Sequence, residues 1–98
     1  PRGGRTLAKI YVDGELFRQI DLAHLDGETE FTIDVGGQKN VVRARSGAIC
    51  MAEANCPDQV CVRQGWIEGG AAPIVCLPHR VVIQLEAGAD SKIDAIAG

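Results

Sequence analysis

Apolar and polar residues alternate along much of the chain, in short runs that end at glycine or at turn-forming pairs. Residues 29–35 show this most clearly, with Phe31, Ile33 and Val35 on one face and charged or polar residues on the other. A period of two predicts a half-buried strand, because successive side chains of a strand point to opposite faces of the sheet. Six further strands are expected, at residues 7–13, 15–21, 40–45, 48–54, 73–77 and 80–86.

Tight turns are expected between these strands. Asp13 and Gly14 separate the first two apolar runs, and a Gly-Gly pair follows the strand at 29–35. An Asp-Gly pair between apolar runs predicts a two-residue hairpin, since glycine adopts positive φ without steric cost. Residues 22–28 are expected to form a turn. Two hairpins in series indicate an antiparallel meander.

One helix is expected, over residues 58–65. Asp58 offers an N-cap side chain and Gly65 is the kind of residue that ends a helix. The predicted fold class is all-β, a small antiparallel β-barrel or sandwich of about seven short strands with one short helix, because a short chain closes its sheet to avoid exposed edges. We expect one domain over residues 7–87, between a disordered N-terminal remnant at 1–6 and a tail at 88–98.

Composition narrows the function classes. The chain has 98 residues, enough for one core, and its 4% aromatic content predicts an aliphatic core in which Trp66 is the large exception. A net charge of −3 argues against direct nucleic-acid binding, which needs a basic face. No apolar run approaches the roughly 18 residues of a membrane span. The chain begins without an initiator Met, so we expect a segment upstream, which leaves a membrane anchor there open.

The most distinctive residues lie between Cys56 and His79. Cys56 and Cys61 are separated by four residues, Cys76 follows after fourteen more, and His79 after another two. Three thiols and one imidazole are a ligand set of structural zinc sites. The four-residue spacing is looser than the usual zinc knuckle, so we predict no resident metal or cofactor and keep these four residues only as candidate ligands.

Other chemistry of the same thiols stays open. A structural disulfide among Cys56, Cys61 and Cys76 would stabilise so small a domain, and a reversible thiol switch is the functional form of the same idea. The spacing of Cys76 and His79 also fits half of a Rieske iron–sulfur site. That site is disfavoured, because Asp58 stands where the other half requires an imidazole.

Two segments, CPDQVCVRQGWI from Cys56 to Ile67 and IVCLPHRVVI from Ile74 to Ile83, resemble the NusG domain II-like family. The resemblance covers about 30 residues in these motifs, and about 80 when the preceding hairpins are included. It implies a compact β-barrel-like domain. It also implies a bacterial protein in which this domain occurs alone, commonly after an N-terminal membrane anchor. The biochemical role of such proteins is not established.

No catalytic constellation is recognisable: the sequence has no Ser-His-Asp arrangement, HExxH motif or phosphate-binding glycine loop. We therefore predict a protein that is not an enzyme, a non-enzymatic interaction or accessory module with a protein partner. We expect an extracytoplasmic location, as the soluble part of a membrane-anchored bacterial protein. The alternative is a cytoplasmic location. Trp66, Arg63 and Arg80 are the candidate interaction surface. The alternative is a thiol-redox or metal-binding protein built on Cys56, Cys61, Cys76 and His79.

Overall fold

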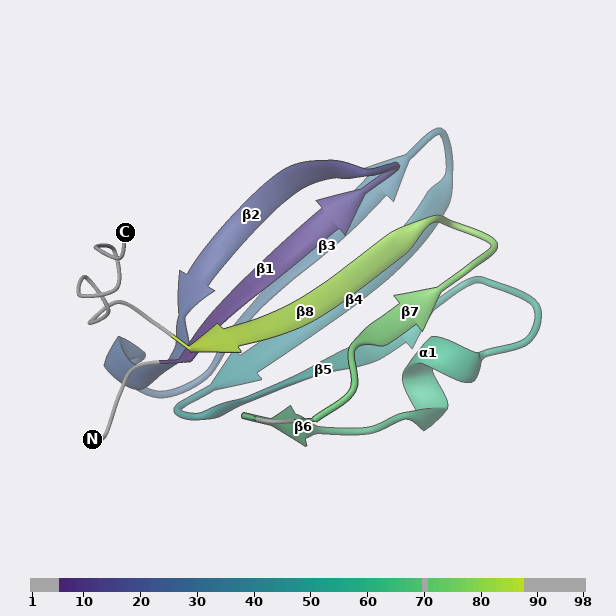
Figure 1. The fold of residues 1–98 in the computed structure, drawn as a ribbon. Coiled ribbons are helices and arrows are strands. Elements are labelled where there is room, and N and C mark those ends of the chain that lie inside the picture. Colours follow the sequence, from purple (N-terminus) through teal and green to yellow (C-terminus); the bar gives the residue numbers. More distant parts are fainter. Residues whose placement is uncertain (1–5, 70, 88–98) are drawn as a thin grey trace.

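In a computed structural model the chain forms two four-stranded antiparallel sheets, with strand orders β2-β1-β8-β7 and β3-β4-β5-β6 (Figure 1). The structure describes residues 6–69 and 71–87. The strands are β1 (Thr6–Val12), β2 (Glu15–Asp21), β3 (Thr29–Val35), β4 (Gln38–Arg45), β5 (Ala48–Ala54), β6 (Ile67–Glu68), β7 (Ile74–Cys76) and β8 (Val81–Ala87). The helices are a 3-10 turn, η1 (Leu22–His24), and α1 (Val60–Arg63).

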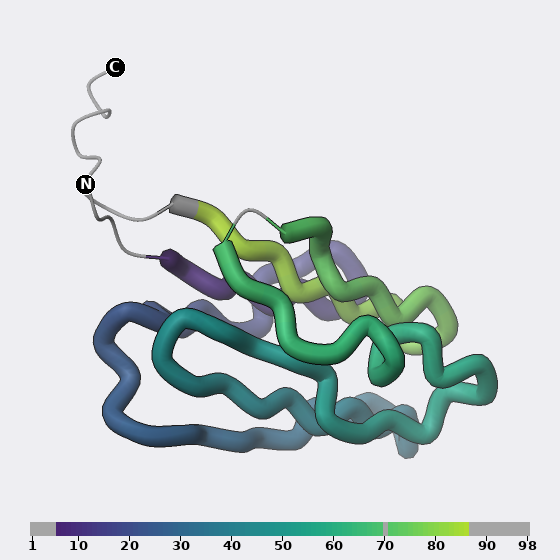
Figure 2. The backbone as a smooth tube through the Cα atoms, turned by 90° about the horizontal axis from the view of Figure 1, so that it is seen from below, coloured from purple at the N-terminus to yellow at the C-terminus, as the bar shows by residue number. Residues whose placement is uncertain are grey.

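The two sheets lie as two layers, which Figure 2 shows edge-on, with β1 and β8 in one layer and β3 and β4 in the other. The all-β prediction is confirmed. Within the part of the chain that the structure describes, the sheets form a sandwich and not a closed barrel. Helix α1 contacts β5 of one sheet and β7 of the other, so it bridges the layers at one end of the molecule.

The predicted hairpin between β1 and β2 is present. Asp13 and Gly14 have φ values of 57° and 85°, and they connect Val12 to its cross-strand partner Glu15. Positive φ at both central residues defines a type I′ turn, whose twist matches that of the strands. The Asp13 backbone N–H also donates to the Arg80 carbonyl at 2.9 Å, which ties this turn to the one between β7 and β8.

Two elements of the structure differ from those that the sequence predicts, and the predicted tails lie outside the described residues. It has eight strands and not seven, because the short β6 pairs with Ala48 and Ile49 of β5. Residues 22–24 form a 3-10 helix inside the segment expected to be only a turn. The expected tails at 1–6 and 88–98 lie outside the described residues, except Thr6, which begins β1.

The core lies between the sheets and is aliphatic, as expected. Its large, fully buried apolar side chains, apart from the cysteines, come from both sheets and from η1: Ile10, Leu22, Ile33, Val42, Ile49, Met51, Ile74, Val81 and Ile83. Trp66 is not among them. It is half-buried, with the Arg45 guanidinium 4.0 Å from its ring centroid, so the expectation of a core Trp66 is wrong. Neither helix of residues 6–69 and 71–87 is long and apolar enough to cross a bilayer.

Candidate functional site: a buried cysteine triad

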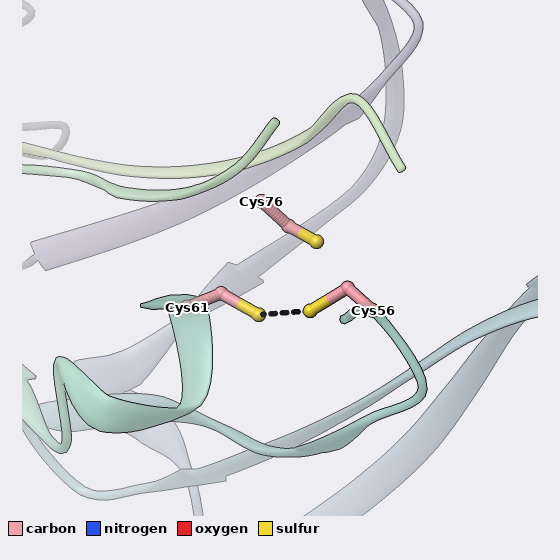
Figure 3. A group of neighbouring side chains, drawn as sticks. All are labelled: Cys56, Cys61 and Cys76. Atoms are coloured by element: carbon pink, nitrogen blue, oxygen red, sulfur yellow. Dashed lines mark hydrogen bonds between the residues drawn. The ribbon is translucent and has the colours of Figure 1, made fainter. Parts of the chain in front are cut away.

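Three cysteines from separate segments meet at the end of the sandwich that α1 covers. Cys56 follows β5, Cys61 lies on α1, and Cys76 ends β7. Their Sγ atoms all lie within 4.8 Å of one another, and those of Cys56 and Cys61 are 3.7 Å apart. Figure 3 shows the three side chains turned towards one another. We call Cys56, Cys61 and Cys76 the triad.

The triad is closed to solvent. Cys56 is 3% exposed, Cys61 0% and Cys76 1%, and all three belong to the hydrophobic core cluster. Reactive cysteines are usually partly exposed, whereas a buried thiol packs as a small apolar side chain. The burial of the three cysteines is therefore explained by a structural role in the core. The feature that distinguishes this site from an ordinary core is that three sulfurs lie close together.

Gln59 shapes the loop that carries the first two cysteines. Its backbone is left-handed, with φ 55°, and its side-chain Nε2 donates to the carbonyls of Ala54 and Cys56, both at 2.7 Å. These bonds fold the chain back on itself between β5 and α1. The helix therefore begins at Val60 with Gln59 as its N-cap, and the prediction that Asp58 is the N-cap is wrong. The Asp58 Oδ1 still accepts from the Val60 N–H at 3.2 Å.

Gln64 sets the position of α1 against β7. Its Nε2 donates to the Pro73 carbonyl at 3.0 Å, and its Oε1 accepts from the Val75 N–H at 3.2 Å. This side chain pairs with the backbone as a neighbouring strand would, so it holds Cys61 opposite Cys76. We did not identify Gln59 or Gln64 as functional residues from the sequence, because neither belongs to a recognisable motif. The one indication in the sequence is that each lies between two of the cysteines.

The surroundings of the triad disfavour thiolates in the metal-free protein. Burial raises the pKa of the Cys61 thiol above its ordinary value of 9.0, and hydrogen bonding with Cys76 and Cys56 adds to the rise. The fourth cysteine, Cys50, is buried outside the triad, and burial also raises its pKa.

Metal-free protein is expected to lose stability at alkaline pH. The pKa of Cys61 is higher in the folded protein than in the unfolded chain. The free energy of unfolding is therefore at its full value below the pKa of the unfolded chain, and it falls as the pH rises towards the pKa of the folded protein. From about pH 9 upward the slope reaches at most about 1.4 kcal/mol per pH unit for each such thiol. Urea unfolding at pH 7 to 10 measures it. Cys61→Val removes the Cys61 contribution and should reduce the slope, while the contribution of Cys50 remains; an unchanged slope would contradict this origin.

His79, the fourth candidate ligand, is not brought into the triad. It is buried, and its Nδ1 lies 2.7 Å from the Oδ1 of Asn40 on β4. An amide oxygen only accepts, so Nδ1 carries the proton. The set of mutually close ligand atoms in the described residues holds the three sulfurs and no imidazole. Asn40 is itself fully buried, and its Nδ2 has no hydrogen-bond partner in that part of the chain.

The disulfide expected from the sequence is not formed in this structure. All four cysteines are free. The sulfurs of Cys56 and Cys61 are in contact at 3.7 Å, far from the roughly 2.0 Å of a disulfide bond. The candidate interaction residues lie on different elements. Arg63 is exposed on α1, Trp66 precedes β6, and Arg80 is exposed and paired with Asp13 at 3.0 Å. A role for them in binding stays a prediction.

Comparison with known proteins gives one family. The family model for NusG domain II matches residues 2–89. The crystal structure of the Lin0431 protein from Listeria innocua is 35% identical, covers 87% of this chain and 99% of its own, and superposes with a TM-score of 0.81.

Two crystal structures of DUF1312 family proteins are also similar. The one from Enterococcus faecalis is 34% identical, covers 86% of this chain and 99% of its own, and has a TM-score of 0.81. The one from Ruminococcus gnavus is 34% identical, covers 83% of this chain and 97% of its own, and has a TM-score of 0.65. No curated protein matches the chain.

Proposed function

The chain belongs to the NusG domain II family, and on that premise we propose that it is a non-enzymatic accessory module that binds a thiophilic metal ion through the triad. One observation carries the proposal: three sulfurs from three segments lie within 4.8 Å of one another. Soft thiolate donors select ions such as Zn²⁺ and Cu⁺.

The distance between the sulfurs suits a single metal ion that all three cysteines bind. Sulfurs that share a tetrahedral metal at 2.3 Å lie about 3.8 Å apart, and Cys56 and Cys61 are already at 3.7 Å. A disulfide would use two sulfurs and leave the third without a role. An ion uses all three, and because Cys76 ends a strand of one sheet while Cys56 follows a strand of the other, it would connect the two layers.

Cadmium titration tests the proposal, because Cd²⁺–thiolate bonds absorb in the ultraviolet. Reduced protein under anaerobic conditions should take up one equivalent. Free ion at about 100 times Kd should raise the free energy of unfolding by about 2.7 kcal/mol. Cys76→Ala should remove both effects. Cys50→Ala is the matched control, since Cys50 is equally a buried thiol but lies outside the triad.

Uptake by Cys76→Ala equal to that of the unmodified protein would refute the assignment to the triad. No uptake by the unmodified, folded and fully reduced protein would refute metal binding altogether. Circular dichroism of each variant distinguishes loss of the site from loss of the fold.

The contact between Cys56 and Cys61 supports a second candidate function, thiol redox chemistry. A sulfur–sulfur distance of 3.7 Å would close to a bond with a small shift of the loop that Gln59 shapes. Intact mass before and after treatment with a reductant tests it. A gain of about 2 Da that requires Cys56 and Cys61, and not Cys76, supports a disulfide cycle; no change after exposure to a disulfide oxidant excludes it.

We further propose a protein partner and an extracytoplasmic location behind an upstream membrane anchor. Support for a partner comes from Leu77, which is 78% exposed directly beside Cys76 and lines a groove of about 370 Å³ with Val60 and Val75. Support for the location comes only from the family resemblance. Fractionation of cells that make the full-length protein, with accessibility to an external protease, tests it; protection in intact protoplasts would contradict it.

A further inference from the structure

The triad supplies three donors and no fourth. Among residues 6–69 and 71–87, the group of mutually close ligand atoms consists only of the three sulfurs. Neither a ring nitrogen of His79, whose Nδ1 is bonded to Asn40, nor a carboxylate oxygen of Asp58 belongs to that group. An ion held here therefore finds three sulfur ligands from the described chain.

Solvent does not readily supply the fourth ligand. The three cysteines are at most 3% exposed and lie within the hydrophobic core cluster. A buried water needs two to four polar partners as well as space. One polar group beside a sulfur is the Gln59 amide, whose Nε2 lies 3.9 Å from Cys56 Sγ. That side chain already serves two carbonyls.

These constraints separate the candidate ions. Zn²⁺ in structural protein sites is almost always four-coordinate, and catalytic zinc with three protein ligands keeps a water in the fourth position. Cu⁺ is softer than Zn²⁺ and is stable with three sulfur ligands in a plane. At a metal–sulfur distance near 2.3 Å, a trigonal site sets the sulfurs about 4.0 Å apart and a tetrahedral site about 3.8 Å. Both values fit the 3.7 Å contact and the 4.8 Å limit of the triad, so the number of donors, and not their spacing, separates the two ions.

We propose that the triad is a three-coordinate site for a monovalent soft ion, Cu⁺, and that it prefers Cu⁺ to Zn²⁺. The inference rests on the proposed metal-binding function and names the ion class of that same site.

The test is a competition under anaerobic conditions. Protein loaded with one equivalent of Zn²⁺ is given one equivalent of Cu⁺ in the presence of excess glutathione, which removes loosely bound copper. Cu⁺ is expected to displace Zn²⁺ and to stay bound through desalting, and Cys50→Ala should behave in the same way. Cys76→Ala should lose the copper to glutathione. X-ray absorption at the copper edge should show three sulfur neighbours and no imidazole scattering.

Different failures have different meanings. If Zn²⁺ or Cd²⁺ binds tightly and Cu⁺ does not displace it, the copper preference is wrong and the proposed metal-binding function stands. A fourth ligand or imidazole scattering at the copper edge overturns the three-coordinate site. If neither Cu⁺ nor Zn²⁺ nor Cd²⁺ binds the reduced, folded protein, both this inference and the proposed function are wrong.

Discussion

Ile83→Ala is expected to lower the free energy of unfolding by about 2–5 kcal/mol, the usual cost of removing a fully buried large aliphatic side chain. Ile83 is 0% exposed in the middle of β8, between Ile10 of β1 and Ile74 of β7 in the sheet register. Domains of this size are stable by roughly 5–15 kcal/mol. The variant therefore loses a large share of its free energy of unfolding. Its melting temperature should fall by about 4–8 °C for each kcal/mol of stability lost.

Urea unfolding of both proteins at one pH measures the difference. Val35→Ala is the matched control, because Val35 is also an aliphatic strand residue but is 52% exposed. Its cost should stay within about 1 kcal/mol. A cost below about 1 kcal/mol for Ile83→Ala would show that Ile83 does not belong to a closely packed interior.

Asn40→Ala is expected to cost about 2–4 kcal/mol, through two effects that act together. It leaves the buried His79 Nδ1 without its acceptor, which costs about 1–3 kcal/mol, and it opens a cavity at a site that is 0% exposed. The loss is moderated because Asn40 Nδ2, which has no hydrogen-bond partner among the described residues, disappears as well. Chemical denaturation of both proteins at one pH measures the change.

A double-mutant cycle isolates the pair. If the 2.7 Å hydrogen bond joins the two residues, the combined Asn40→Ala and His79→Ala variant should lose about 1 kcal/mol less than the sum of the single losses. Thr32→Ala, an exposed change on β3, serves as the control for additivity with either variant. Strict additivity of Asn40 and His79 would contradict the pairing.

Much of the fold could be predicted from local sequence. The period-two pattern at 29–35 corresponds to β3, and Asp13-Gly14 forms the predicted turn, because both depend on nearest neighbours in the chain. The strand β6 could not be predicted. It has two residues, and it exists because β5 lies beside it and pairs with Ile67 and Glu68.

The start of the helix was misplaced for a similar reason. Asp58 has the right side chain for an N-cap, but Gln59 adopts a left-handed backbone and bonds across the loop to Ala54 and Cys56. Those acceptors become available only when β5 and the loop are folded. A local capping preference of about 1 kcal/mol is easily overridden by such contacts.

In the segment from Cys56 to His79, too, some features follow from the sequence and others depend on tertiary contacts. The sequence by itself determined which residue types were present, their spacing and the family to which they belong. Only the tertiary structure decided that Cys56, Cys61 and Cys76 meet while His79 turns to Asn40 and Cys50 stays apart. The physical reason is that these groups come from different strands and loops, and their distances depend on how the two sheets stack, which no local pattern encodes.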